Sequence, residues 1–118
     1  MIDLAEVLRD LAARPGVEAV VLVSPDGLPI QQAGPASADA DALAALAATA
    51  HRQAARLAEG AGQGDLRTVV LEADGGVLVL SDAGAAGHVL LLKVSLDAAF
   101  GDLLHELRRE RTALGALL

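Results

Sequence analysis

Three runs of valine and leucine constrain the fold more than any other feature of the sequence. Residues 17–24 read VEAVVLVS, residues 76–82 read GVLVLSD, and residues 88–94 read HVLLLKV. Each run is short and mostly aliphatic, with little polar alternation, which is typical of a strand covered on both faces. The sequence therefore predicts a sheet with helices packed against both of its faces.

Two turns join these runs to neighbouring strands. Ser24-Pro25-Asp26-Gly27 separates the first run from a strand expected at residues 28–33, where Pro29 indicates a sheet edge. Asp74-Gly75-Gly76 joins a strand at 66–73 to the run at 76–82 and is typical of a tight hairpin. Asp26 is interpreted as a turn residue rather than a catalytic acid, because no partner for acid–base chemistry lies near it in the sequence.

Helical periodicity occupies three further segments. Apolar residues at helical spacing predict a helix over residues 3–13, with Asp3 as its cap and Pro15 at its end. A second helix is expected from a cap at Ser37 or Asp39 to about Glu59, and a third over 97–117. The order α-ββ-α-βββ-α predicts one α+β domain spanning residues 1–118, in which three helices flank a five-stranded, mainly antiparallel sheet.

Composition argues against two classes of function, nucleic-acid binding and membrane insertion. The chain of 118 residues has a formal net charge of −7, one phenylalanine, and no tyrosine, tryptophan or cysteine. It lacks the basic clusters that neutralise phosphates and the aromatic side chains that stack on bases, so we do not expect a nucleic-acid partner. The acidic charge and the short apolar runs also argue against membrane insertion. We expect a cytoplasmic protein.

The motifs of common active sites are missing from the sequence. There is no Walker phosphate-binding loop, and no GxGxxG motif follows a strand. His51, His88 and His105 lie on separate predicted elements and do not form an HExxH motif. We therefore expect no catalytic residue, no metal site and no cofactor, and we expect that the protein is not an enzyme.

The second helix carries the most informative pattern. At 100° per residue, one stripe is expected to face the sheet, charged and polar residues lie opposite, and a flank of mostly small residues lies between. A small-residue flank allows close approach of another helix, although alanine also simply favours helix formation. The stripe is Leu43, Leu46, Ala50, Ala54 and Leu57; the opposite face is Asp41, Thr49, Arg52, Arg56 and Glu59; the flank is Ala44, Ala48, His51 and Ala55.

The strand predicted at 66–73 adds to the case for self-association. It follows a glycine-rich loop and carries Arg67 and Glu72 near its ends, as an edge strand could. An edge with apolar Val69, Val70 and Leu71 needs a cover, which a second copy of the chain would supply most simply.

The order of elements, together with RPGVEAVVLVSPDGLPI, ALAALAATAHRQAARLAEG, GDLRTVVLEADGGVLVLSDAG and HVLLLKV, resembles the Roadblock/dynein light-chain family. The resemblance is greatest to the bacterial, gliding-regulator members that accompany Ras-like GTPases. It implies a profilin/Roadblock-like fold and an obligate dimer formed through the second helix and third strand. It also implies that a Ras-like small GTPase docks on the paired helices, and that hydrolysis is stimulated by remodelling of the GTPase rather than by a supplied catalytic residue.

The resemblance also implies positions for both contacts. Two other functions stay open: a small-molecule sensory domain, although few polar side chains line the expected core, and a purely structural dimeric scaffold subunit. The implied dimer surface is Ala44, Ala48, His51, Ala55, Thr68, Val69, Val70 and Leu71, and the implied GTPase contact is Thr49, Arg52, Arg56 and Glu59.

Overall fold

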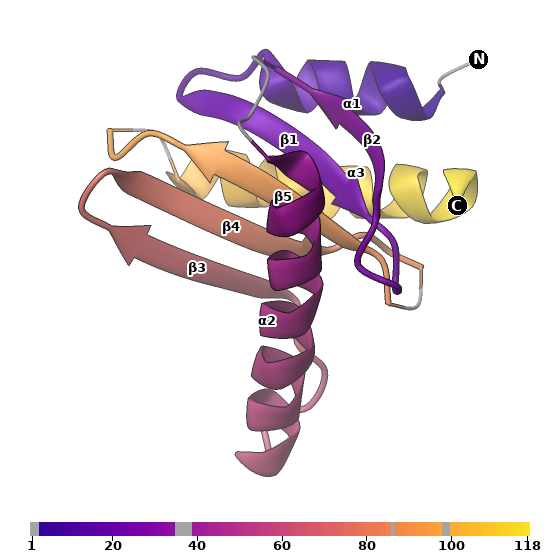
Figure 1. Cartoon of the computed structure of the whole chain (residues 1–118), viewed down its shortest axis with the longest axis vertical. Coiled ribbons are helices and arrows are strands. Elements are labelled where there is room, and N and C mark those ends of the chain that lie inside the picture. Colours follow the sequence, from indigo (N-terminus) through magenta and orange to yellow (C-terminus); the bar gives the residue numbers. More distant parts are fainter. Residues whose placement is uncertain (1–2, 35–38, 86, 98–99) are drawn as a thin grey trace.

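The computed structural model describes residues 3–34, 39–85, 87–97 and 100–118 and has the predicted order of elements (Figure 1). The boundaries lie within about two residues of those expected, apart from the start of the last helix, expected at residue 97, where residues 98–99 fall outside the described chain. The helices are α1 (Leu4–Ala12), α2 (Ala40–Gly60) and α3 (Phe100–Leu117); the strands are β1 (Val17–Val23), β2 (Pro29–Ala33), β3 (Thr68–Ala73), β4 (Gly76–Asp82) and β5 (Val89–Val94).

The five strands form one antiparallel sheet in the order β2-β1-β5-β4-β3. The three apolar runs are the central strands β1, β5 and β4. Consecutive residues of each are buried, which confirms that both faces are covered. The strand that contains Pro29 is one edge, as predicted, and β3 is the other. Ala73 pairs with Gly76, so Asp74 and Gly75 form the two-residue hairpin loop that the sequence predicts.

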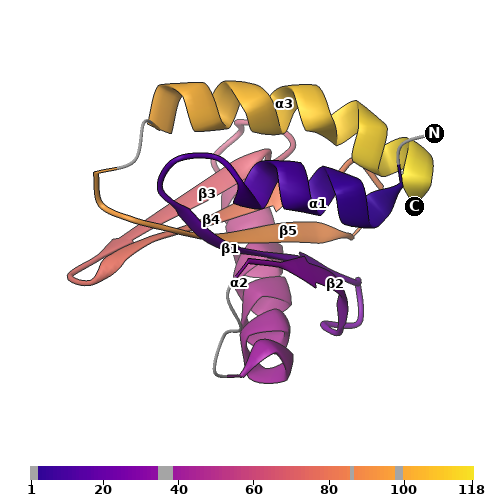
Figure 2. The same cartoon turned by 90° about the horizontal axis from the view of Figure 1, so that it is seen from above.

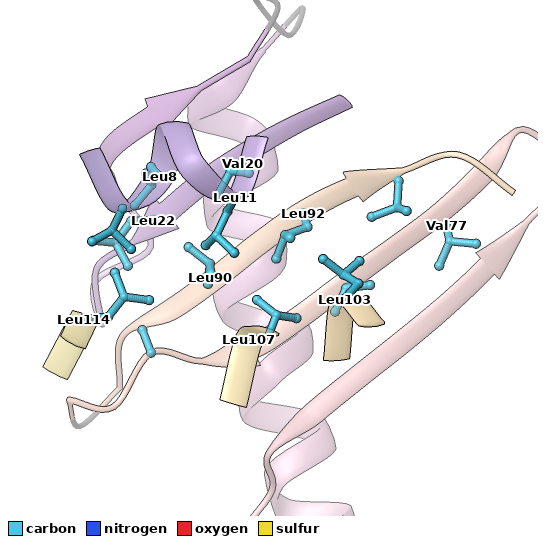
Figure 3. Packing of buried hydrophobic residues seen from close by; sticks show 14 residues of the cluster. Leu8, Leu11, Val20, Leu22, Val77, Leu90, Leu92, Leu103, Leu107 and Leu114 are labelled. Atoms are coloured by element: carbon cyan, nitrogen blue, oxygen red, sulfur yellow. The ribbon is translucent and has the colours of Figure 1, made fainter. Parts of the chain in front are cut away.

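Helices cover both faces of the sheet, α1 and α3 on one and α2 on the other (Figure 2). On the first face, leucines of α1 and α3 point at Leu22, Leu90 and Leu92 of the central strands (Figure 3). On the second face, alanines of α2 pack against a smaller cluster that includes Val21, Leu80 and Leu91. Each central strand thus contributes alternate side chains to two separate cores.

The helix caps and the turn predicted from the sequence make the expected hydrogen bonds. The Asp3 carboxylate accepts a hydrogen bond from the Glu6 amide at 2.9 Å, and Asp39 accepts one from the Ala42 amide at 3.0 Å. Ser37, the alternative cap of α2, lies outside the described residues. In the Ser24–Gly27 turn, the Gly27 amide donates to the Ser24 carbonyl at 2.9 Å, and Gly27 has φ +82°. A Cβ at Gly27 would lie 3.3 Å from the Cα of Ala45, so this turn packs closely on α2.

The C-terminal part of α3 is fixed by a backbone contact between two glycines. A Cβ on Gly115 would lie 2.9 Å from the Gly84 carbonyl oxygen, and a Cβ on Gly84 would overlap the carbonyl oxygen of Arg111. The Arg111 guanidinium also donates to the Asp82 carboxylate at 2.7 Å. The β4–β5 connection and the end of α3 are therefore held together by a close approach that tolerates no side chain.

We expect Gly115→Ala and Gly101→Ala to have opposite effects, although both add a methyl group to α3. Gly115→Ala forces the helix off Gly84 and should destabilise the fold by roughly 1–3 kcal/mol. A Cβ at Gly101 meets nothing within 4 Å, so Gly101→Ala should stabilise it by about 0.5–1 kcal/mol through helix propensity. Urea denaturation followed by circular dichroism measures both. Equal effects of the two substitutions would contradict the contact.

Candidate interaction surface

Alanines, not leucines, form the face of α2 that packs on the sheet. Ala44, Ala47 and Ala48 are 0%, 5% and 3% exposed and contact the cluster on β1, β4 and β5. The expectation that Ala44 and Ala48 belong to a dimer surface is therefore corrected, because they are buried within their own chain. The physical reason is that valines and leucines already fill the sheet face, so the helix approaches closely only through small side chains.

Two leucines of the stripe expected to face the sheet are instead exposed. Leu46 is 66% exposed and Leu57 is 74% exposed, so the predicted orientation of α2 is wrong for both. Only Leu43 and Ala50 pack at the margin of the sheet cluster. These residues recur at heptad-like spacing and form an apolar stripe along the side of α2. We call Leu43, Leu46, Ala50, Ala54 and Leu57 the leucine seam.

The polar face of α2 lies where the sequence predicts it. Thr49, Arg52, Arg56 and Glu59 are all exposed. The Thr49 hydroxyl donates to the Ala45 carbonyl at 3.1 Å and accepts a hydrogen bond from Arg52 Nη2 at 3.3 Å. This contact holds the Arg52 guanidinium against its own helix, whereas Arg56 makes no hydrogen bond or ion pair with the described part of the chain.

The β3 edge is apolar and regular. All six residues of β3 pair with β4 without a shift in register. Val70 and Leu71 are 49% and 46% exposed, whereas Thr68 and Val69 are half-buried. The edge therefore combines exposed apolar side chains with an outer row of strand backbone that pairs with no strand of the described chain.

His51 and Ala55, the remaining residues of the predicted dimer surface, are half-buried on α2. The Nε2 atom of His51 is buried and has no hydrogen-bond partner among the described residues. Burial lowers the pKa of His51 below its ordinary value, although the nearby Asp82 carboxylate acts in the opposite direction.

Asp82 connects His51 to the end of α3. Burial alone would raise the pKa of Asp82, but hydrogen bonds from the Gly84 amide at 2.9 Å and from Arg111 outweigh it and hold that pKa low. The carboxylate therefore stays ionised beside both Arg111 and the His51 ring, which lie on helices on opposite faces of the sheet.

The lowered pKa of His51 predicts a loss of stability on mild acidification. The unfolded chain binds a proton near pH 6.5, whereas the folded chain binds it only at lower pH. The stabilisation is thus fully present above pH 6.5 and is lost as the pH falls toward the folded-state pKa. His51→Gln should flatten this dependence.

Denaturation midpoints in urea at several values between pH 8 and 5 measure the effect, with the exposed His105→Gln as the control. The raised pKa of Glu110, caused by its burial and by the nearby Glu106 and Asp10, acts with the opposite sign. This effect of Glu110 is common to all variants, so the difference between wild type and His51→Gln gives the contribution of the histidine to the pH dependence. Parallel curves for these two proteins would refute the assignment.

The described residues contain no cluster of three or more histidine, cysteine, aspartate or glutamate side chains that could hold a metal. On the other face of the sheet, the acidic side chain of Glu106 is used in packing. Glu106 is 8% exposed and forms an ion pair with Arg14 at 2.7 Å, which ties the α1–β1 connection to α3.

Within the described chain, no helix is both long and apolar enough to cross a membrane.

Sequence reasoning missed the exposure of Leu46 and Leu57 and a hollow of about 200 Å³ beside Lys93, on the α2 face of the sheet. The sequence of α2 itself could have indicated that these leucines are exposed. Its alanine flank and its leucine stripe are both apolar, and a helix with two apolar faces packs against two surfaces. No sequence signal located the hollow, because its walls come from three strands and a helix.

The fold is that of a profilin-like α+β domain, with one helix on one face of the sheet and two on the other. Residues 3–93 match the family described as the Roadblock/LC7 domain. Two uncharacterized proteins of Methanocaldococcus jannaschii are each 35% identical over 91 residues, which cover 77% of this chain and 78% of theirs. The chain belongs to the Roadblock/LC7 family.

Solved structures agree with this assignment. The Roadblock/LC7 domain from Streptomyces avermitilis is 30% identical, with a TM-score of 0.84 and coverage of 95% of this chain and 94% of that one. The gliding protein MglB from Thermus thermophilus is 22% identical, with a TM-score of 0.83 and coverage of 95% and 85%. Another MglB structure, described as having a tetrameric arrangement, has the same identity and coverage and a TM-score of 0.84. At this identity, the MglB structures establish the shared fold.

Proposed function

We propose that the protein is a homodimeric, non-catalytic adaptor of the cytoplasm that binds a Ras-like small GTPase and stimulates its GTP hydrolysis. The observation that carries the proposal is the exposure of two unlike faces on α2: the leucine seam and the arginine-bearing face beside it. Family membership and the likeness to MglB support it, and the MglB structure with a tetrameric arrangement is consistent with self-association.

The leucine seam and the β3 edge form the proposed dimer surface. It contains exposed Leu46, Leu57, Val70 and Leu71, with His51 at its border. Burying each leucine would contribute about 1.5–3 kcal/mol, and every contact occurs twice in a two-fold dimer. A second copy would also pair with the outer backbone of β3 and remove an exposed sheet edge.

We expect Leu57→Glu to dissociate the dimer. Loss of two buried leucines, about 3–6 kcal/mol per dimer, should raise the dimer Kd by roughly 100- to 10,000-fold. Light scattering over a range of protein concentrations measures the change. Leu28→Glu is the matched control, because Leu28 is 60% exposed at the opposite sheet edge. A wild-type chain that is monomeric at micromolar concentration would contradict the dimer itself.

The arginine-bearing face forms the proposed GTPase contact. Arg52 and Arg56 are cations on a chain whose net charge is −7, so they favour an acidic docking surface on the partner. Thr49 holds Arg52 along the helix, which argues against Arg52 as an arginine finger. Stimulation of hydrolysis is therefore assigned to remodelling of the GTPase on binding.

We expect Arg56→Glu to weaken GTPase binding roughly tenfold or more by charge reversal at the contact, with the dimer unchanged. The measurement is titration of purified small GTPases from the same cell, loaded with GDP or a GTP analogue, together with GTP turnover. Arg9→Glu, an equal charge change on α1 across the sheet, is the control. If Arg56→Lys keeps binding but abolishes stimulated turnover, Arg56 acts as an arginine finger and the remodelling mechanism is wrong.

The two other functions predict different outcomes. A structural scaffold subunit would dimerise but bind none of the GTPases in either nucleotide state. A sensory domain would show a large, saturable thermal shift with a small metabolite.

A further inference from the structure

A hollow of about 200 Å³ lies on the α2 face of the sheet, beside the leucine seam. The register of the sheet explains where it forms. Ala19, Lys93 and Leu78 pair side by side across β1, β5 and β4, next to the row of residues on which α2 packs. We call this feature the Lys93 hollow. It is lined by Ala19, Val21, Leu43, Leu78, Leu91 and Lys93.

The small side chain of Ala19 keeps the hollow open. Val21, the next residue of β1 on the same face, packs under α2 and is almost fully buried. Leu43 of α2 forms the wall on the helix side. Between this wall and the Lys93 side chain, position 19 contributes only a methyl group, so a larger side chain there would fill the space.

Lys93 is the only charged side chain that lines the hollow. It is the single lysine of the sequence, it is exposed, and it makes no hydrogen bond or ion pair with the described part of the chain. Glu18 of β1 lines an adjoining depression together with Lys93 but forms no ion pair with it. An unpaired ammonium beside apolar walls attracts an anion more strongly than one surrounded by water.

The size and the charge of the hollow together specify its occupant. An engineered apolar cavity of about 150 Å³ holds benzene, a six-carbon molecule, so the Lys93 hollow has room for a chain of about eight carbons. A pure hydrocarbon would remove water from the ammonium without giving it a partner, which is costly. A small inorganic anion would leave the apolar walls uncovered. An aliphatic chain that ends in a carboxylate satisfies both the walls and the charge.

We propose that the Lys93 hollow binds a medium-chain aliphatic carboxylate, with about six to eight carbons against the apolar walls and the carboxylate paired with the Lys93 ammonium. The proposal goes beyond GTPase binding and does not rest on it, because Arg52 and Arg56 lie roughly 140–180° around α2 from Leu43. Leu57 and the β3 edge, which carry the proposed dimer contact, line no part of the hollow. The site is therefore assigned to the wild-type dimer as well as to the single chain.

Titration of octanoate into the wild-type protein, followed by calorimetry, tests the proposal. We expect saturable binding with a Kd of about 0.1–1 mM and no binding of acetate, which lacks the chain. Lys93→Met keeps the length of the side chain and removes its charge, so the Kd for octanoate should rise at least about tenfold. Arg9→Met, an equal loss of charge on α1 across the sheet, is the matched control. An octanoate titration that does not saturate, or a Kd for Lys93→Met within about threefold of wild type, would overturn the proposal.

Filling the hollow tests its shape without changing its charge. Ala19→Leu should raise the Kd for octanoate at least about tenfold, because the added side chain occupies the space of the ligand. Circular dichroism verifies that the variant is folded. A folded Ala19→Leu chain with wild-type affinity would place octanoate elsewhere and refute the site.

An independent readout needs no substitution, because Lys93 is the single lysine of the sequence. N-hydroxysuccinimidyl acetate acetylates the Lys93 amine and the α-amino group of the chain, and peptide mass spectrometry distinguishes the two. Saturating octanoate should slow acetylation of Lys93 at least about threefold and leave that of the α-amino group unchanged. Equal rates at Lys93 with and without octanoate would contradict the ion pair.

The same titration with Leu57→Glu, the variant expected to be monomeric, separates this proposal from that of the dimer. We expect both proteins to bind octanoate with Kd values within about threefold of each other. Binding by Leu57→Glu alone would show that a second copy covers the hollow in the wild-type protein, and would overturn the proposal. Arg56→Glu should bind octanoate as wild type does, so a failure of GTPase binding and a failure of this site are distinguishable.

Discussion

The close packing of α2 on an already filled sheet is the contact on which the surface of this protein depends. The central strands place valines and leucines on the α2 face, and the helix meets them with alanines that are almost fully buried. Because the contact uses small side chains, the large apolar residues of α2 are left on its other side. The packing of the α2 alanines on the sheet thus leaves the leucine seam on the surface of the domain.

The opposite face of the sheet is packed by large side chains instead of alanines. There α1 and α3 supply leucines that fill the core, and α3 is tied down by the Gly84–Gly115 backbone contact and by ion pairs from Arg111 and Arg14. Large side chains directed inward leave a mostly polar outer surface on these helices. The asymmetry between the two faces favours α2 as the side used for association.

The fold could be predicted almost completely from the sequence because its signals are local. The Asp74-Gly75 hairpin, the Asp3 cap and Pro29 at the sheet edge each depend on a few adjacent residues. The orientation of α2 could not be predicted, because two stripes of the helix are apolar. Which stripe faces the sheet depends on the volume available above the sheet. Leu57 was therefore assigned to the core. The hollow beside Lys93 is lined by three strands and a helix, so it could be found only in the three-dimensional structure.

The two edges of the sheet explain why association through β3 is physically favoured over association through β2. The edge strand β2 carries Pro29, which has no amide hydrogen to donate, and its pairing with β1 shifts register between Leu22 and Val23. Both features discourage pairing with another strand. The β3 edge has neither: its register is unbroken, and Val70 and Leu71 are half-exposed. The C-terminal part of α2, which carries the exposed Leu57, extends past this same edge (Figure 1), so a single two-fold contact would cover strand backbone and leucine side chains together.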